Sequence, residues 1–327
     1  MITRREILIA LGASALTVPL ATYAQQQSKV WRVGFMSTRP GADSGEEKFR
    51  QSLRELGYVE GQNIVIERRY GKGNTDLFRE YAAELVRLKV DCIVANGIDA
   101  TLAAKLATPT IPIVMAGAND DPVRRGLVAS LARPGGNVTG FIGIGSELAG
   151  KRLQLLKEIL PNASRVAILW DPSSVPAVSH VKETEAAARV LGVQLQSLDV
   201  RDADALEKAF QAAGKERAQA LIVVATGFMN SHQERITNLA ANARLPAIYS
   251  NSQFVLAGGL MSYAADRDEQ FRGAATYVGR ILKGTKPADL PVQQPTKFEF
   301  IVNLKAAKQI GLTIPRSVIA RADKVIE

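Results

Sequence analysis

The chain has 327 residues, of which 46% are hydrophobic and 22% are charged. This length predicts about two domains, and the balance of apolar and charged residues argues against a disordered or multi-span membrane protein. The formal net charge is +9, but basic residues are spread along the chain and aromatic residues make up only 6%. A nucleic-acid surface, which needs clustered cations and stacking platforms, is therefore not expected.

Few residues are available for metal or covalent chemistry, since the chain has one cysteine and two histidines. Cys92 lies inside an apolar run and is expected to be a buried structural thiol. His180 and His232 lie in helical stretches without a second ligand three or four residues on, so surface or capping roles are expected. We expect no cofactor, no metal and no catalytic residues.

Residues 1–24 have the order of an export signal, which predicts a periplasmic protein. Arg4 and Arg5 precede an apolar stretch, residues 7–20, and small residues occupy both cleavage-site positions. The apolar stretch is shorter than the roughly 20 residues of a membrane-spanning helix. Sec and twin-arginine export both remain open, because the two arginines also fit a twin-arginine signal.

The rest of the chain alternates short apolar runs with longer amphipathic stretches, as the strands and helices of a parallel α/β sheet do. In chain order, the first expected elements are strand 32–36, helix 46–56, strand 63–69, helix 75–88, strand 91–95, helix 99–107 and strand 111–115.

The same order returns about 130 residues later. The run 165–169 repeats the first strand at an offset of 133 residues, and 245–248 repeats 111–114 at an offset of 134. Strands of successive α/β units can fall into step by chance, but four such landmarks in order favour two lobes of one architecture.

Three stretches are expected to cross between the lobes: 138–143, 258–263 and 297–303. A helix over 268–282 would return to lobe one between the second and third crossings. These crossings place residues 30–142 plus 264–296 in lobe one and 143–263 plus 297–327 in lobe two. The expected fold class is α/β, with two Rossmann-like lobes of parallel sheet joined by a three-strand hinge.

Ligands of open parallel sheets bind beyond the carboxyl ends of the strands. Small, hydroxylated, amide and acidic residues at these ends suit a ligand carboxylate or ammonium, although any one of them alone reads equally as a helix cap or turn. Trp170 has two readings, stacking on a planar ligand or packing against the hinge. The candidate ligand-binding residues are Ser37, Thr38, Asn96, Gly97, Asn119 and Asp120 in lobe one, Trp170, Asp171, Thr226, Gly227 and Asn251 in lobe two, and Tyr263 at the hinge.

Residues 145–152 match the G-x-x-x-x-G-K pattern of a phosphate-binding loop. Arg152 stands where that loop needs a magnesium-binding Ser or Thr, and Glu147 would repel phosphate. We therefore interpret Ser146 as a helix N-cap and place Lys151 and Arg152 on an exposed helix face.

Four segments resemble the ABC-transporter substrate-binding protein family that includes tryptophan/tyrosine-type binding proteins. The most specific is Arg-Pro-Gly-Gly-Asn-Val-Thr-Gly within 130–140, and the others are 57–64, 258–263 and 291–299. The resemblance covers essentially the whole mature chain and implies a type I periplasmic-binding-protein fold. One departure is Asp120, which stands where relatives commonly have glycine before Asp-Pro-Val and adds a charge near the cleft.

The expected function is therefore that of a periplasmic receptor of an ABC importer, without catalysis. Its lobes would close on a small carboxylate-bearing ligand, an aromatic or branched amino acid, and deliver it to an ABC permease in the inner membrane. The alternative is a ligand sensor that presents its bound state to a membrane receptor.

Overall fold

A computed structural model describes residues 29–327 except Gly73 and Asn119. The predicted export signal therefore lies outside the described residues. Residues 31–327 form one compact unit. In the described part of the chain, no helix combines the length and the apolar character that crossing a membrane requires.

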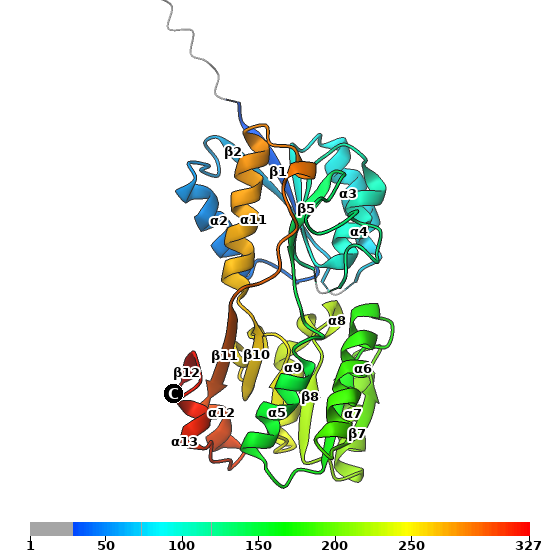
Figure 1. Ribbon diagram of the computed structural model, residues 1–327, viewed down its shortest axis with the longest axis vertical. Helices are drawn as coiled ribbons and strands as arrows, with labels where there is room; N and C mark the ends of the chain where they lie inside the picture. Colours follow the sequence, from blue (N-terminus) through cyan, green and yellow to red (C-terminus); the bar gives the residue numbers. More distant parts are fainter. Residues whose placement is uncertain (1–28, 73, 119) are drawn as a thin grey trace, which may run out of the picture. The chain divides into compact units, whose positions relative to one another are not determined.

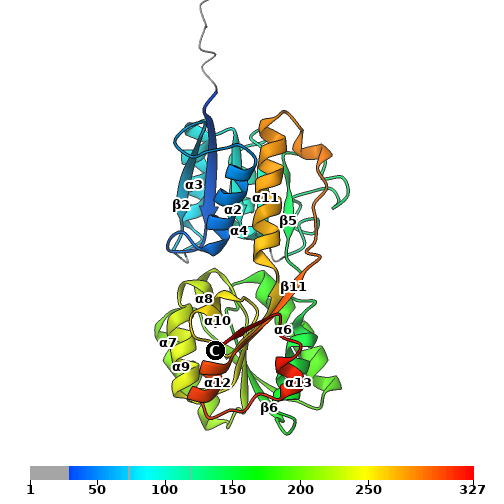
Figure 2. The same cartoon turned by 90° about the vertical axis from the view of Figure 1, so that its left-hand side faces the viewer.

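The first sheet has the strand order β2-β1-β3-β4-β5, and all its neighbouring strands are parallel. Its strands are β1 (Trp31–Ser37), β2 (Ile64–Tyr70), β3 (Cys92–Asn96), β4 (Ile113–Ala118) and β5 (Val138–Ile142). Helices cover both faces (Figure 1, Figure 2). On one face lie α2 (Ser44–Glu55) and α11 (Arg267–Leu282), and on the other α3 (Leu77–Arg87) and α4 (Ile98–Ala107).

The second sheet has the strand order β12-β11-β10-β9-β8-β6-β7, and within it only the β10–β11 pair is antiparallel among the described residues. Its strands are β6 (Arg165–Trp170), β7 (Gln194–Asp199), β8 (Ala220–Val223), β9 (Ala247–Tyr249), β10 (Met261–Ala265), β11 (Phe298–Asn303) and β12 (Lys324–Ile326). One face carries α5 (Ala149–Ile159), α6 (Val175–Val190), α12 (Leu304–Gln309) and α13 (Arg316–Ile319), and the other carries α7 (Asp204–Lys215), α9 (Gln233–Asn242) and α10 (Gln253–Leu256). The short helix α8 (Gly227–Ser231) follows β8, and a 3₁₀ turn, Pro287–Asp289, follows α11.

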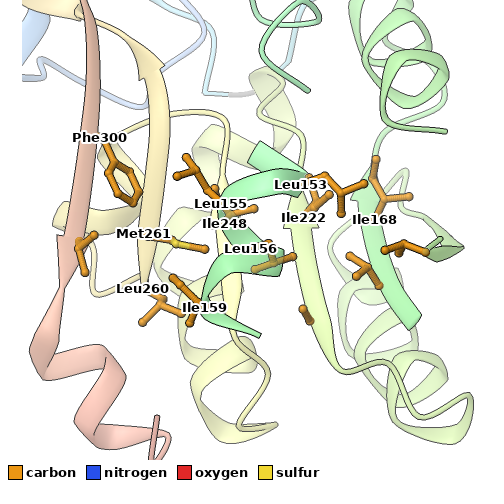
Figure 3. Packing of buried hydrophobic residues seen from close by; sticks show 14 of the residues in the cluster. Leu153, Leu155, Leu156, Ile159, Ile168, Ile222, Ile248, Leu260, Met261 and Phe300 are labelled. Atoms are coloured by element: carbon orange, nitrogen blue, oxygen red, sulfur yellow. The ribbon is translucent and has the colours of Figure 1, made fainter. Parts of the chain in front are cut away.

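The alternation of apolar side chains explains why each sheet is covered on both faces. Successive residues of a strand point to opposite faces. In β1, Phe35 packs with α2 and α11, whereas Met36 packs with α3 and α4. In β6, Ile168 packs against α5 and α6, as Figure 3 shows, whereas Leu169 packs against the helices of the opposite face. Both faces are apolar, as is typical of buried parallel sheets.

The two halves share one strand order, β2-β1-β3-β4-β5 in the first sheet and β7-β6-β8-β9-β10 in the second. The predicted α/β class with two parallel-sheet lobes is confirmed. The chain passes between the sheets after β5, after β10 and before β11, and α11 packs against the first sheet. The residue bounds given above for each lobe stay a prediction.

Gly140 explains the end of the most specific sequence segment. Its φ is +127°, and a Cβ built there would lie 2.3 Å from the carbonyl oxygen of Met115. Only glycine fits this position, because a side chain would collide with the backbone of β4. The segment thus ends with the residue that lets β5 pair closely with β4.

Candidate functional site

A cavity lies between the carboxyl ends of the two sheets. From the first sheet it is lined by Asn96 at the end of β3 and by Gly117 of β4. From the second sheet it is lined by Ala225 after β8, Asn251 after β9 and Ala265 at the end of β10. This is the position at which open parallel sheets bind ligands.

The ionisable groups of the cavity lining are basic. Arg152, His180 and Arg267 line it, and no aspartate or glutamate does so among the residues that the structure describes. Amide and hydroxyl groups and the apolar side chains of Phe271 and Leu148 complete the wall. Such a lining suits a ligand with an anionic end and an apolar body.

Arg152 is 1% exposed and belongs to the first turn of α5, so the expectation of an exposed arginine was wrong. Its Nε donates to the carbonyl oxygen of Tyr263 at 2.7 Å, and its Nη1 donates to that of Gly145 at 2.8 Å. Burial lowers the pKa of Arg152 to about 9. The guanidinium still carries its charge at neutral pH.

The reason for this error is helical spacing. Arg152 falls four residues after Leu148 and four before Leu156, on the face of α5 that packs against the second sheet. The same helix begins at Ala149, later than predicted, and Ser146 is not its N-cap. The hydroxyl of Ser146 instead donates to the carboxylate of Glu147 at 3.0 Å.

His180 is 4% exposed, so the surface role expected for it was also wrong. Its Nε2 lies 2.5 Å from Nη1 of Arg152. Because a guanidinium can only donate, Nε2 accepts this hydrogen bond and the imidazole is neutral. Burial, reinforced by the charge of Arg152, lowers the pKa of His180 well below its usual value. His232 does have the expected capping position, between α8 and α9.

Arg267 reaches the cavity from the N-terminus of α11 and is paired with Asp43. Its Nη2 lies 2.7 Å from Oδ2 of Asp43, and Nε of Arg39 lies 3.3 Å from the same oxygen. Burial opposes ionisation of Asp43, but the two arginines outweigh it and lower the pKa of the carboxyl. Burial, reinforced by the charge of Arg267, lowers the pKa of Arg39 to about 10.

Of the predicted ligand-binding residues, Asn96 and Asn251 line this cavity. Ser37 is buried behind Asn96, whose Nδ2 donates to its hydroxyl at 3.3 Å. Gly97 precedes α4 with a φ of +102°. Thr38 lies against Gly227, so these two predicted residues meet across the lobes.

Four further candidates are engaged in local contacts. The indole N–H of Trp170 donates to Ser197 at 2.7 Å, and its ring packs on the second-sheet core. A carboxylate oxygen of Asp171 accepts from the backbone N–H and hydroxyl of Ser173. Thr226 caps α8. The ring of Tyr263 packs near two phenylalanines of β11.

Asp120 is held within its own loop. Its carboxylate accepts from Arg124 at 2.8 Å and from Arg125 at 2.6 Å, and its side chain is 2% exposed. The charge that this departure from the family pattern adds is therefore compensated locally. Asn119 lies outside the described residues. Ligand contact by the twelve candidates stays a prediction.

Sequence reasoning missed most of the cavity lining. Arg152 and His180 carry a readable signal, since each occupies an apolar face at helical spacing; His180 stands three residues after Ala177 and four before Thr184, which are both buried. Arg267, Gln270 and Phe271 had no such signal. They come from α11, which follows the second lobe in the chain but lines the cavity from the first.

Comparison with known proteins agrees with this architecture. A curated relative, the tyrosine-binding protein of Clostridioides difficile (strain R20291), is 26% identical over 305 residues, which are 92% of this chain and 86% of the relative. A conserved domain protein from Vibrio cholerae has a similar crystal structure, with a TM-score of 0.82 and 28% identity over 91% of this chain and 100% of that chain.

The structure of an ABC domain from Streptococcus pneumonia in complex with L-Trp has a TM-score of 0.79 and 24% identity, covering 90% of this chain and 99% of that chain. The type I fold predicted for the chain is confirmed by these solute-binding structures. Residues 33–326 match the family described as ABC transporter substrate binding protein. The chain therefore belongs to the ABC transporter substrate-binding protein family, whose members bind solutes and are not enzymes.

Proposed function

We propose that this protein is the periplasmic receptor of an ABC importer and that its lobes close on an aromatic amino acid. The observation that carries the proposal is the cavity between the two sheets, whose ionisable lining residues are basic in the described chain. A carboxylate matches this lining, and an aromatic side chain matches the apolar wall formed by residues such as Ile144, Leu148 and Phe271.

The relatives support the same ligand class. The C. difficile relative is named for tyrosine, and the similar S. pneumonia structure contains L-Trp. Both ligands carry the carboxylate that the sequence analysis expected and the aromatic group that was one of its two options.

Closure is the proposed mechanism of signalling. A ligand that touches both lobes stabilises the arrangement in which they face each other, by as much as its affinity differs between the two arrangements. The closed receptor would then present a different surface to the permease in the inner membrane. Export through the signal at residues 1–24 would bring the protein to that compartment.

The test is isothermal titration calorimetry on residues 25–327, refolded from denaturant to remove any ligand that co-purifies. We expect binding of L-tyrosine or L-tryptophan, weaker binding of L-leucine, and a smaller radius of gyration in X-ray scattering when ligand is bound. Deleting the gene should abolish uptake of the same amino acid by cells, which separates an importer from a sensor. Failure to bind any carboxylate would overturn the proposal.

A further inference from the structure

Arg152 carries a charge that its surroundings do not neutralise. Its partners in the described chain are the carbonyl oxygens of Tyr263 and Gly145 and the neutral ring of His180. The cavity that it lines contains no carboxylate among those residues. A buried charge without a counter-charge is costly, and the cost is relieved when a ligand supplies the opposite charge.

The helix around Arg152 increases this cost. Arg152 is the fourth residue of α5, where the partial positive charge of the helix N-terminus disfavours a cation. The first turn of α5 contains no acidic residue, and neither does that of α6, whose residues Pro176 and Ala177 also line the cavity. Two helix N-termini and one guanidinium thus meet at one end of the cavity.

The neighbours of Arg152 hold the guanidinium in one orientation. Nη1 donates to both Gly145 and His180, and Nε donates to Tyr263. These hydrogen bonds to described residues use Nε and Nη1, so Nη2 is left for a ligand. The other cavity arginine, Arg267, differs because Asp43 already compensates its charge at 2.7 Å.

We propose that Arg152 binds the carboxylate of the ligand, with Nη2 donating to a carboxylate oxygen. His180 acts as a positioning residue that fixes the guanidinium by accepting from Nη1. This inference rests on the proposed function and adds to it the group that selects acids over their neutral derivatives. An amide in place of the carboxylate would bring no negative charge to compensate Arg152.

The experiment compares acid with amide by calorimetry, using L-tyrosine with L-tyrosinamide and L-tryptophan with L-tryptophanamide. For the unmodified chain we expect the amide to bind at least about 30-fold more weakly, in the range that a lost hydrogen bond to a charged group produces. In Arg152→Met the acid should lose about the same factor, and acid and amide should then bind within about threefold of each other. Lys151→Met, at the neighbouring lysine that pairs with Gln154, should keep the full preference.

The outcomes separate this inference from the proposed function. If the unmodified chain binds no aromatic amino acid and no other carboxylate, the proposed function fails. If it binds the acid but binds the amide equally well, or if Arg152→Met keeps the acid preference, the role of Arg152 is refuted while the function stands. Arg152→Lys, which keeps the charge but not the planar fork, should retain part of the preference if Arg152→Met proves unfolded by circular dichroism.

Discussion

His180 gives the protein a built-in sensitivity to acid. The imidazole is buried beside Arg152, and burial followed by that neighbouring charge lowers its pKa. The unfolded chain takes up a proton as the pH falls through about 6.5, the ordinary value for histidine, whereas the folded chain does not. Below that pH the unfolded state therefore binds more protons, and the free energy of unfolding decreases.

We predict that the free energy of unfolding falls by up to about 1.4 kcal/mol per pH unit between pH 6.5 and 5.5 from this one group. Urea unfolding at several pH values measures the slope. His180→Gln should reduce it, whereas His232→Gln, at the histidine that bonds the carbonyl of Phe228, should leave it unchanged. Equal slopes in the unmodified chain and His180→Gln would contradict this account.

Cys92 shows the opposite kind of inertness. It is 0% exposed, as its apolar run predicted, and burial raises the pKa of its thiol. Since the thiolate is the reactive form, we predict no reaction with a thiol reagent in the folded protein. Labelling in mild urea should follow unfolding. Val190→Cys, placed at a side chain that is 86% exposed, should react at once.

Residue identity alone could not show that Arg152 is buried. A Lys-Arg pair after a glycine reads as an exposed helix face, and only the surrounding leucines at helical spacing indicate otherwise. The partner of Arg152, His180, lies on a separate helix. Two helices that pack side by side bring these residues together, and no local pattern encodes that pairing.

Among the elements, β5 depends on the absence of a side chain at Gly140. We predict that Gly140→Ala destabilises the protein by about 3 kcal/mol or more, because its Cβ would lie 2.3 Å from the carbonyl oxygen of Met115. Urea unfolding measures this loss. Gly136→Ala is the matched control, since a Cβ there meets no heavy atom within 4 Å. A similar stability of both variants would show that β4 and β5 can separate without cost.

The order of elements was predictable because periodicity is a local property. The expected first strand at 32–36 is β1, and the expected helix at 99–107 is α4. The start of α5 was not predictable, because Ser146 has the residue type of an N-cap but its hydroxyl bonds to Glu147. Side-chain competition of this kind is decided by geometry after the chain has turned.

At the scale of the whole molecule, polar contacts join the two lobes outside the cavity. Nη1 of Arg39, after β1, donates to Oε1 of Gln233 in α9 at 3.1 Å. Nε2 of Gln253 in α10 donates to the hydroxyl of Ser44 in α2 at 3.0 Å. These side chains lie outside the ligand cavity described above, so they influence binding only through the arrangement of the lobes.

We predict that Gln233→Ala weakens ligand binding by about two- to fivefold, the effect of one hydrogen bond lost from the facing arrangement. Calorimetry with the aromatic amino acid measures the change, and X-ray scattering should show a more extended ligand-free protein. Gln51→Ala, which removes a contact to Glu55 within α2, is the control. Unchanged affinity in Gln233→Ala would mean that this contact does not contribute to closure.

The two-lobed architecture was predictable from the repeat of strands about 130 residues apart, because each lobe repeats the same units. The lining of the cavity was not. It combines side chains such as Asn96, Arg152 and Phe271 from distant parts of the chain, and their meeting depends on how the two lobes are connected.

The placement of α11 has a consequence for biosynthesis. Phe271, Tyr277 and Val278 of this helix fill the core of the first sheet, although the whole chain from β6 to β10 is made before them. A nascent chain leaving the ribosome therefore cannot complete its N-terminal half until translation is nearly finished. Such late completion keeps the polypeptide loosely packed during the interval in which a translocation pore must accept it.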